Sequence, residues 1–174
     1  MTTLPALTSP TSLELPYRMG VGIMLINADG RVWTGRRRPK WSEDRASYIW
    51  QMPQGGIAKG ESPREAALRE LREETSIKSV LFLAEHPRWL TYDLPMELIG
   101  IALKGKYRGQ CQRWFAMKFV GDDSEIDIGS RRGVKAEFDR WAWRQPKELA
   151  ELVVPFKRKV YEAVISDFTQ YWRV

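Results

Sequence analysis

The chain has 174 residues, of which 43% are hydrophobic and 11% aromatic, enough for one globular domain with a substantial core. Its formal net charge of +6 favours an anionic partner, either an acidic small molecule or a nucleic acid. A single cysteine, Cys111, excludes an intramolecular disulfide and fits a cytoplasmic protein, and no apolar run approaches the ~20 residues of a membrane span.

The N-terminal segment, residues 1–14, is rich in Thr, Ser and Pro, and we expect it to form a disordered tail. It lacks the basic and long apolar stretches of a secretory signal. Residues 15–174 are expected to form a single domain, because no repeat or linker divides them. The domain begins with two predicted strands, 17–26 and 32–36, joined by a turn that contains Asn, Asp and Gly.

The next predicted element is a helix over 63–75 with a well-defined start. Ser62 is suited to the N-cap, Pro63 to the first helical position and Glu65 to the third, which together form a capping box. Residues 53–56 (PQGG), just upstream, predict a loop whose backbone can approach a ligand closely.

Three glutamates of this helix, Glu70, Glu73 and Glu74, share one side of it. A rotation of about 100° per residue places them within an arc of about 100°. Like charges at these spacings cost an isolated helix ~0.2–0.5 kcal/mol per pair. A solvated acidic face is one interpretation, and a divalent metal site is the other, because Mg²⁺ takes oxygen ligands and is commonly shared with substrate phosphates.

The surrounding helical positions favour the metal site. Leu68, Leu71 and Thr75 are expected to face the core, which leaves the glutamate arc to one side of the buried stripe. Arg69 lies four residues before Glu73 and can orient its carboxylate. Ala66, within the acidic arc, is expected to leave room for ions.

The rest of the chain alternates further strands with helices. Strands are predicted at 80–84, 89–92, 113–120 and 138–144, a short helix at 146–152 and a longer one at 155–172. The mixture indicates an α/β layered domain.

Basic and aromatic residues form two clusters that could bind an anion. Residues 36–40 (RRRPK) precede the glycine loop, where a solvated loop is the alternative interpretation. Residues 157–159 (KRK) lie in the first turn of the last helix, where cations oppose the helix dipole unless an anion docks nearby. Phe156 is suited to stacking on a base, whereas core packing is the alternative for it, for Trp50 and for Tyr92. The single histidine, His86, is interpreted as structural.

Residues 55–77 resemble the Nudix box, G-x5-E-x7-R-E-U-x-E-E-x-G-U, where U is a bulky aliphatic residue. Its specified positions are occupied here by Gly55, Glu61, Arg69, Glu70, Leu71, Glu73, Glu74 and Ile77, and Gly56 belongs to the same loop. The resemblance implies the Nudix fold, a mixed β-sheet sandwiched between helices (α/β/α). Ser76 departs from the pattern, which has glycine there, and we expect φ > 0 at a cost of about 1 kcal/mol.

Residues 16–170 are similar to the bacterial RNA pyrophosphohydrolases, a Nudix subfamily that also includes diadenosine tetraphosphate hydrolases. The segments that carry this similarity are WQMPQGGI at 50–57, RWLTYDLP at 88–95, QCQRWFAMKF at 110–119, EFDRWAW at 137–143 and VVPFKRKVY at 153–161. The resemblance implies that Mg²⁺, or Mn²⁺ in its place, is held by Glu70, Glu73, Glu74 and Glu137. It also implies that Arg18, Arg37, Tyr92, Val154, Phe156 and Lys157 bind the 5′ end and first bases. Residues 41–47 depart from shorter family members and leave the fine specificity open.

The resemblance therefore implies a Mg²⁺-dependent pyrophosphohydrolase acting on 5′-triphosphorylated RNA, with diadenosine tetraphosphate as the alternative substrate. Glu70 helps to hold the metal, and Glu73 or Glu137 accepts the proton of the attacking water. A non-catalytic module that senses nucleotides is a rival interpretation, but all the box glutamates are present. A hydrolase of free deoxynucleoside triphosphates is another, and the RNA-like segments 88–95 and 153–161 argue against it. No obligate protein partner and no membrane are expected.

Overall fold

The sheet at the centre of the fold is built around one long pair of parallel strands. The computed structural model describes residues 14–38, 49–130, 133 and 135–173. Its strands are β1 (Tyr17–Ile26), β2 (Val32–Arg37), β3 (Trp50–Gln51), β4 (Gln54–Gly56), β5 (Val80–Glu85), β6 (Leu90–Asp93), β7 (Gly109–Phe119) and β8 (Phe138–Arg144). The order β3-β2-β1-β7-β5 forms the main path, and β4, β6 and β8 pair with β1, β7 and β2. Only β1 and β7 run parallel, so the sheet of the described residues is mixed.

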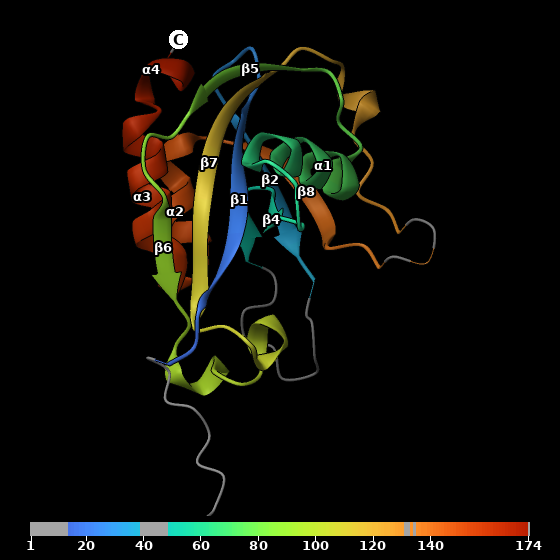
Figure 1. Ribbon diagram of the computed structural model, residues 1–174. Coiled ribbons are helices and arrows are strands. Elements are labelled where there is room, and N and C mark those ends of the chain that lie inside the picture. The colour runs from blue at the N-terminus through green and yellow to red at the C-terminus, as the bar shows by residue number, and fades with distance from the viewer. Residues whose placement is uncertain (1–13, 39–48, 131–132, 134, 174) are drawn as a thin grey trace, which may run out of the picture.

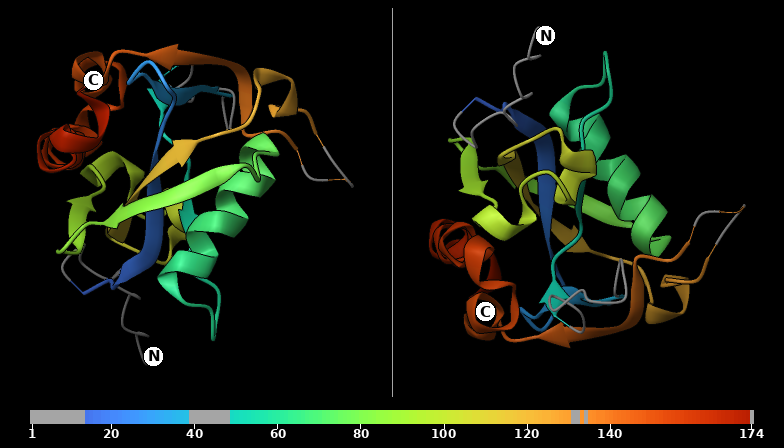
Figure 2. Two further views of the ribbon diagram at one scale, coloured as in Figure 1. Left: turned by 90° about the horizontal axis from the view of Figure 1, so that it is seen from above. Right: turned by 90° about the horizontal axis from the view of Figure 1, so that it is seen from below.

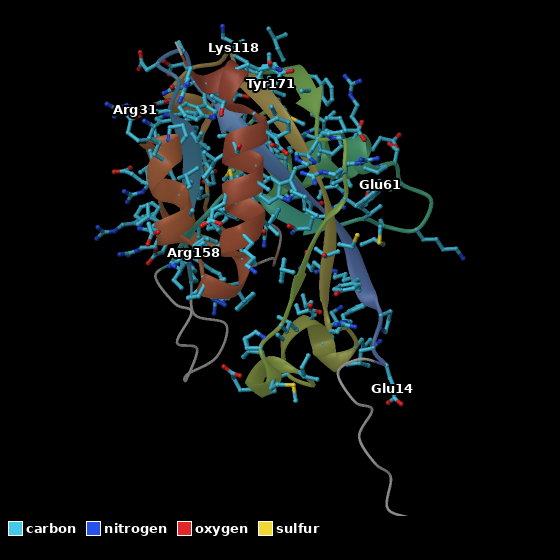
Figure 3. All side chains as sticks on the ribbon, turned by 90° about the vertical axis from the view of Figure 1, so that its left-hand side faces the viewer. Glu14, Arg31, Glu61, Lys118, Arg158 and Tyr171 are labelled. Atoms are coloured by element: carbon cyan, nitrogen blue, oxygen red, sulfur yellow. The ribbon has the colours of Figure 1, made fainter. Side chains whose placement is uncertain are left out.

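Helices cover both faces of this sheet (Figures 1 and 2). They are α1 (Pro63–Thr75) on one face and α2 (Leu149–Leu152), α3 (Arg158–Asp167) and α4 (Thr169–Trp172) on the other. In Figure 3, Glu61 beside α1 and Arg158 of α3 accordingly lie on opposite sides. The expected α/β/α arrangement is confirmed.

Strand β1 lies inside the sheet and is buried on both faces. Val21, Ile23 and Leu25 pack with α1, whereas Met24 and Ile26 pack with the layer of α2 and α3. Alternate side chains of a strand point to opposite faces, so one apolar run supplies both cores.

The sheet opens between β1 and β2. These strands pair at Ile26 and Val32, next to their turn, and then diverge. Strand β4 takes the place beside β1, with Gly55 opposite Val21, while β3 pairs with the end of β2. The chain from 50 to 56 therefore crosses the opening. The predicted loop at 53–56 is partly wrong, because residues 54–56 form a strand.

Helix α1 has the predicted bounds and the predicted capping box, in which Glu65 N donates to Ser62 Oγ (3.3 Å) and Ser62 N to Glu65 Oε2 (2.8 Å). Two of the three residues predicted to face the core, Leu71 and Thr75, are fully buried, and the third is not. Leu68 is 39% exposed, whereas Ala66 is fully buried in the core and leaves no room for ions. Ala66, Ala67 and Leu71 fill the space between the helix and the strands, and the Glu70 carboxylate lies against Gly55 of β4.

The other predicted elements differ from the structure mainly at their ends. Strand β7 begins at Gly109, four residues earlier than predicted, and β6 is shifted by one residue. The predicted long terminal helix is a 3₁₀ turn, Pro155–Lys157, followed by α3 and α4, with a break at Phe168. The Phe168 ring is buried, with its centroid 5.7 Å from that of His86, so packing sets the break.

Two sequence predictions concern parts of the chain that are not described in full. The 41–47 segment and the proposed tail as far as residue 13 lie outside the described residues. None of the helices in the described part of the chain has the length and apolar character needed to cross a bilayer.

Ser76 has the predicted left-handed conformation, with φ 67° and ψ −6°, and its N–H donates to Arg72 O (2.9 Å). Replacing Ser76 by glycine is therefore expected to raise the free energy of unfolding by up to about 1 kcal/mol, since Cβ strain is removed. Thermal melting of the two proteins checks this prediction. A lower melting temperature for Ser76→Gly would show that the serine hydroxyl contributes more than the strain costs.

Candidate active site

The carboxylate of Glu70 lies directly against the glycine strand β4. A Cβ on Gly55 would clash with this carboxylate, so glycine allows the close approach. The Glu70 side chain is only 15% exposed. Burial raises its pKa, and the neighbouring Arg69 opposes that shift. A carboxylate in such surroundings gains from any additional positive charge.

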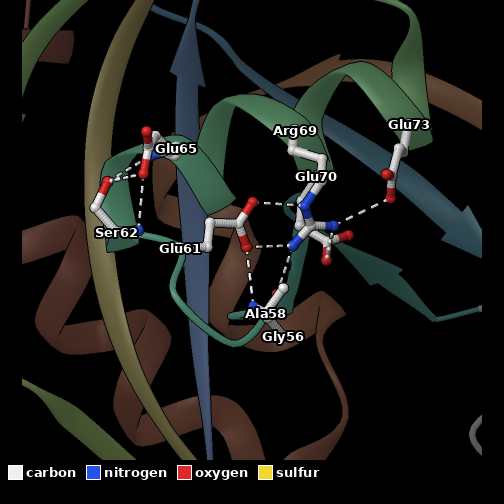
Figure 4. Close-up of polar contacts among 8 residues, drawn as sticks. All are labelled: Gly56, Ala58, Glu61, Ser62, Glu65, Arg69, Glu70 and Glu73. Carbon is white, nitrogen blue, oxygen red and sulfur yellow. Dashed lines mark hydrogen bonds and ion pairs between the residues drawn. The ribbon is translucent and has the colours of Figure 1, made fainter.

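Arg69 connects the acidic helix to the loop before it (Figure 4). Its Nε and Nη2 donate to the two oxygens of Glu61 at 2.7 and 2.9 Å, and Nη2 also donates to Gly56 O at 2.8 Å. Its Nη1 donates to Glu70 at 2.8 Å and to Glu73 at 3.2 Å. The predicted contact with Glu73 is present, but it is the longest of the set.

Glu73 and Glu74 lie further along the same helix. The Glu73 side chain is 59% exposed, so its carboxylate is accessible to water. Glu74 Oε2 accepts a hydrogen bond from Gln54 N (3.2 Å), which ties it to the start of β4.

Glu137 comes from a different part of the fold, just before β8. Its carbonyl oxygen accepts from Arg38 N (2.9 Å), and the neighbouring Arg37 N donates to Ile49 O (2.8 Å). Glu137 and Arg37 thus lie at the end of the β2–β8 pair, across the opening of the sheet from β1.

The donor chemistry of the acidic residues fits a hard divalent cation. All four predicted ligands offer carboxylate oxygens, and one positive group, Arg69 Nη1, is already shared by Glu70 and Glu73. Within the described residues, however, no three acidic, His or Cys side chains are grouped closely enough to hold a metal ion. Glu137 in particular is contributed by a separate segment from the three helical glutamates.

Several predicted substrate-binding residues come together on the sheet face opposite to α1. We call this set the platform, and it consists of Arg18, Tyr92, Phe156 and Lys157. The ring centroids of Phe156 and Tyr92 are 5.5 Å apart. Lys157 Nζ lies 5.3 Å from the ring centroid of Tyr92. Val154, half-buried, precedes the 3₁₀ turn that carries Phe156 and Lys157. Lys157 is buried, so its stem packs in the core while its charged end lies over an aromatic face.

Arg18 joins the platform to the acidic helix. A Cβ on Gly56 would clash with its guanidinium, so this glycine makes room for Arg18 as Gly55 does for Glu70. The charge of Arg18 lowers the pKa of both Glu70 and Tyr92, against the larger effect of burial, which raises them. Arg18 therefore lies close to both groups.

Sequence reasoning missed two buried glutamines beside the platform, Gln110 and Gln112 of β7. The alternation of polar residues in GQCQRW next to an apolar run could have indicated a strand with a polar buried face.

Glu61 gives a pH-dependent contribution to stability. Hydrogen bonds from Arg69 and from Ala58 N lower its pKa from 4.5 to about 2. Because the pKa is lower in the folded state, this contribution is present above pH 4.5 and is lost as the pH falls towards 2. Glu61→Gln should therefore show a shallower loss of stability between these pH values in urea titrations. Equal slopes for the variant and the wild type would contradict this prediction.

Comparisons with known proteins identify relatives of this chain. A family model described as NUDIX domain matches residues 16–164. The curated RNA pyrophosphohydrolase of Brucella anthropi is 59% identical over 158 residues, which cover 89% of this chain and 91% of that protein. The RNA pyrophosphohydrolase of Agrobacterium fabrum is 56% identical, with 89% and 93% covered.

Solved structures support the same fold at lower identity. The E. coli dihydroneopterin triphosphate pyrophosphohydrolase superposes with a TM-score of 0.62 at 20% identity, covering 87% of this chain and 99% of that chain. A C. elegans Ap4A hydrolase complex has a TM-score of 0.62 at 15% identity, covering 88% and 96%.

Proposed function

Because the chain belongs to the NUDIX family, the Nudix hydrolases, we propose that it removes pyrophosphate from the 5′-triphosphorylated ends of RNA. The reaction is a hydrolysis of a phosphoanhydride bond. The curated relatives at 54–59% identity carry the name RNA pyrophosphohydrolase, and this chain aligns with most of their length. Both findings support this substrate. A cytoplasmic location is part of the same proposal and fits the single cysteine.

The observation that carries the proposal is the path from the acidic helix to the platform. Arg18 lies against Gly56, whose carbonyl also accepts from Arg69, and its charge acts on both Glu70 and Tyr92. A ligand with its phosphates beside the glutamates would place its following nucleotides over aromatic rings and cationic groups. A 5′-triphosphorylated RNA has this distribution of charge and bases.

The predicted roles follow from the chemistry of each group. Glu70, Glu73, Glu74 and Glu137 would hold Mg²⁺, or Mn²⁺ in its place, which when bound neutralises phosphate oxygens and lowers the pKa of water. Glu73 or Glu137 would accept the proton of the water whose oxygen attacks phosphorus. The bond between the α-phosphorus and the bridging oxygen then breaks, so pyrophosphate leaves and a 5′-monophosphorylated RNA remains. Arg18, Arg37 and Lys157 would offset the charge of the substrate.

A comparison of turnover on three substrates tests the proposal. Wild-type protein with Mg²⁺ is expected to hydrolyse triphosphorylated RNA with a higher kcat/KM than diadenosine tetraphosphate or free nucleoside triphosphates. A preference for diadenosine tetraphosphate would establish the alternative substrate class instead. Absence of turnover on all three substrates would favour a nucleotide-sensing module.

Phe156 tests whether bases stack on the platform. Phe156→Ala is expected to reduce kcat/KM for triphosphorylated RNA by about 1–3 kcal/mol, since one base loses its aromatic partner. The loss on free nucleoside triphosphates should be much smaller, because they have no second base. Equal losses on both substrates would mean that Phe156 serves only in core packing with Tyr92.

A further inference from the structure

A directed series of hydrogen bonds runs through three side chains of β7, Trp114, Gln112 and Gln110, which we call the glutamine relay. All three are buried, with exposed fractions of 0%, 1% and 5%. Trp114 Nε1 and Gln112 Oε1 are 3.2 Å apart, and Gln112 Nε2 lies 3.0 Å from Gln110 Oε1 and 3.4 Å from Gln54 Oε1.

The indole at one end sets the direction of the relay. An indole N–H can only donate, so the atom of Gln112 that faces it must be the carbonyl oxygen. The amide nitrogen of Gln112 then points to Gln110 and occupies its carbonyl oxygen. The NH₂ group of Gln110 is left over, and it has no hydrogen-bond partner within the described part of the chain.

The register of the sheet places this amide group beside the platform. Gln110 is paired with Arg18 on β1 and with Tyr92 on β6. Directly paired residues on neighbouring strands point to the same face, so the three side chains form one row. A Cβ on the adjacent Gly20 would lie 3.0 Å from Gln110 Oε1 and 2.8 Å from Gly55 O, so glycine preserves the space beside the amide.

Gln110 and the cationic residues of the platform present donors to a ligand. Arg18 and Lys157 carry N–H groups and no acceptor, and the relay leaves Gln110 with its two N–H groups. Turning the Gln110 amide over would place its nitrogen against Gln112 Nε2 and lose that hydrogen bond. The Gln110 amide nitrogen is not among the buried side-chain atoms that lack a partner in the described residues, so it is accessible and can donate to an acceptor on a ligand.

We propose that the amide nitrogen of Gln110 contacts the substrate by donating to an acceptor of the RNA 5′ segment, either a phosphate oxygen or a base carbonyl oxygen. Gln112 and Trp114 are positioning residues, because they hold the amide in its donor orientation. This inference rests on the proposed function, since it adds a binding determinant to the same site.

Two substitutions at Gln110 separate donor chemistry from packing. Gln110→Met keeps much of the side-chain volume without N–H groups, and kcat/KM for triphosphorylated RNA is expected to fall about 10-fold. Gln110→Glu keeps the shape but presents an anion to acceptors, and a fall of at least about 100-fold is expected. Cys111→Ala is the matched control, because its side chain points to the opposite face of β7, and wild-type values are expected.

The dependence on substrate identifies the acceptor. If it is a base carbonyl, the loss in Gln110→Met should be larger for RNAs whose first bases are guanine or uracil than for adenine. If it is a phosphate, the loss should be the same for every base and should extend to free nucleoside triphosphates. In both cases Gln110→Glu must be the worse variant.

Other outcomes would overturn the inference. Equal losses in Gln110→Met and Gln110→Glu, accompanied by equal falls in melting temperature, would mean that the relay is only structural. Wild-type kcat/KM in both variants would overturn the inference while leaving the proposed function intact. Failure of the wild-type protein to hydrolyse triphosphorylated RNA would instead remove the proposed function, and this inference with it.

Discussion

Replacing Glu73 by glutamine is expected to lower kcat on triphosphorylated RNA by at least about 10²-fold, equivalent to roughly 2.7 kcal/mol of activation free energy. Glutamine keeps the size of the side chain but removes the negative charge that a metal ligand or a general base needs. Folding should be nearly unchanged, because Glu73 is 59% exposed and its contact with Arg69 is long, at 3.2 Å. Steady-state kinetics at saturating Mg²⁺ together with thermal melting measure both effects.

The matched control is Glu162→Gln, which removes one exposed carboxylate from α3. Its turnover should equal that of the wild type, so the general effect of one lost charge is subtracted. Wild-type turnover in Glu73→Gln would show that Glu73 is neither a metal ligand nor the base, and would leave Glu137 as the candidate base.

Replacing Arg69 by methionine is expected to lower both stability and activity. The change removes the hydrogen bonds to Glu61, Gly56 and Glu73 and leaves the largely buried Glu70 without its cation. Breaking such a partly buried ion pair should cost about 2–3 kcal/mol, or a fall in melting temperature of about 5–10 °C. Thermal melting checks the stability, and kcat on triphosphorylated RNA should fall because Glu70 and the glycine strand lose their alignment.

Arg72→Met provides the comparison on the same helix, because Arg72 is exposed. We expect its melting temperature to stay within about 2 °C of the wild type. Similar melting temperatures for the Arg69 and Arg72 variants would mean that the contacts of Arg69 contribute little to the fold.

Local signals in the sequence predicted the bounds of α1 correctly. Ser62, Pro63 and Glu65 act within one turn of the helix, and Ser76 acts at the other end, so neighbouring residues suffice. Helical periodicity also placed Leu71 and Thr75 correctly in the core, but it could not show that Leu68 is exposed. The exposure of Leu68 and the burial of Ala66 depend on how the helix lies against the sheet, and the close approach of Glu70 to Gly55 is part of that packing.

The site shows the same division between local and long-range information. The carboxylates of the Nudix box follow from spacing along the chain, whereas the contact of Arg69 with Gly56 follows from the path of the loop. The proximity of Arg18 to Tyr92 requires the register of β1, β7 and β6, which joins residues more than 70 positions apart. The glutamine relay depends on that register too, so reading each strand separately could not reveal it.

The most direct test of the proposed reaction is product analysis of 5′-triphosphorylated RNA incubated with the wild-type protein, with and without Mg²⁺. With Mg²⁺ we expect pyrophosphate and 5′-monophosphorylated RNA in equal amounts, and with excess chelator we expect neither. Unchanged triphosphorylated RNA at saturating Mg²⁺, or equal pyrophosphate release in the presence of chelator, would contradict a metal-dependent RNA pyrophosphohydrolase built on the glutamates of α1.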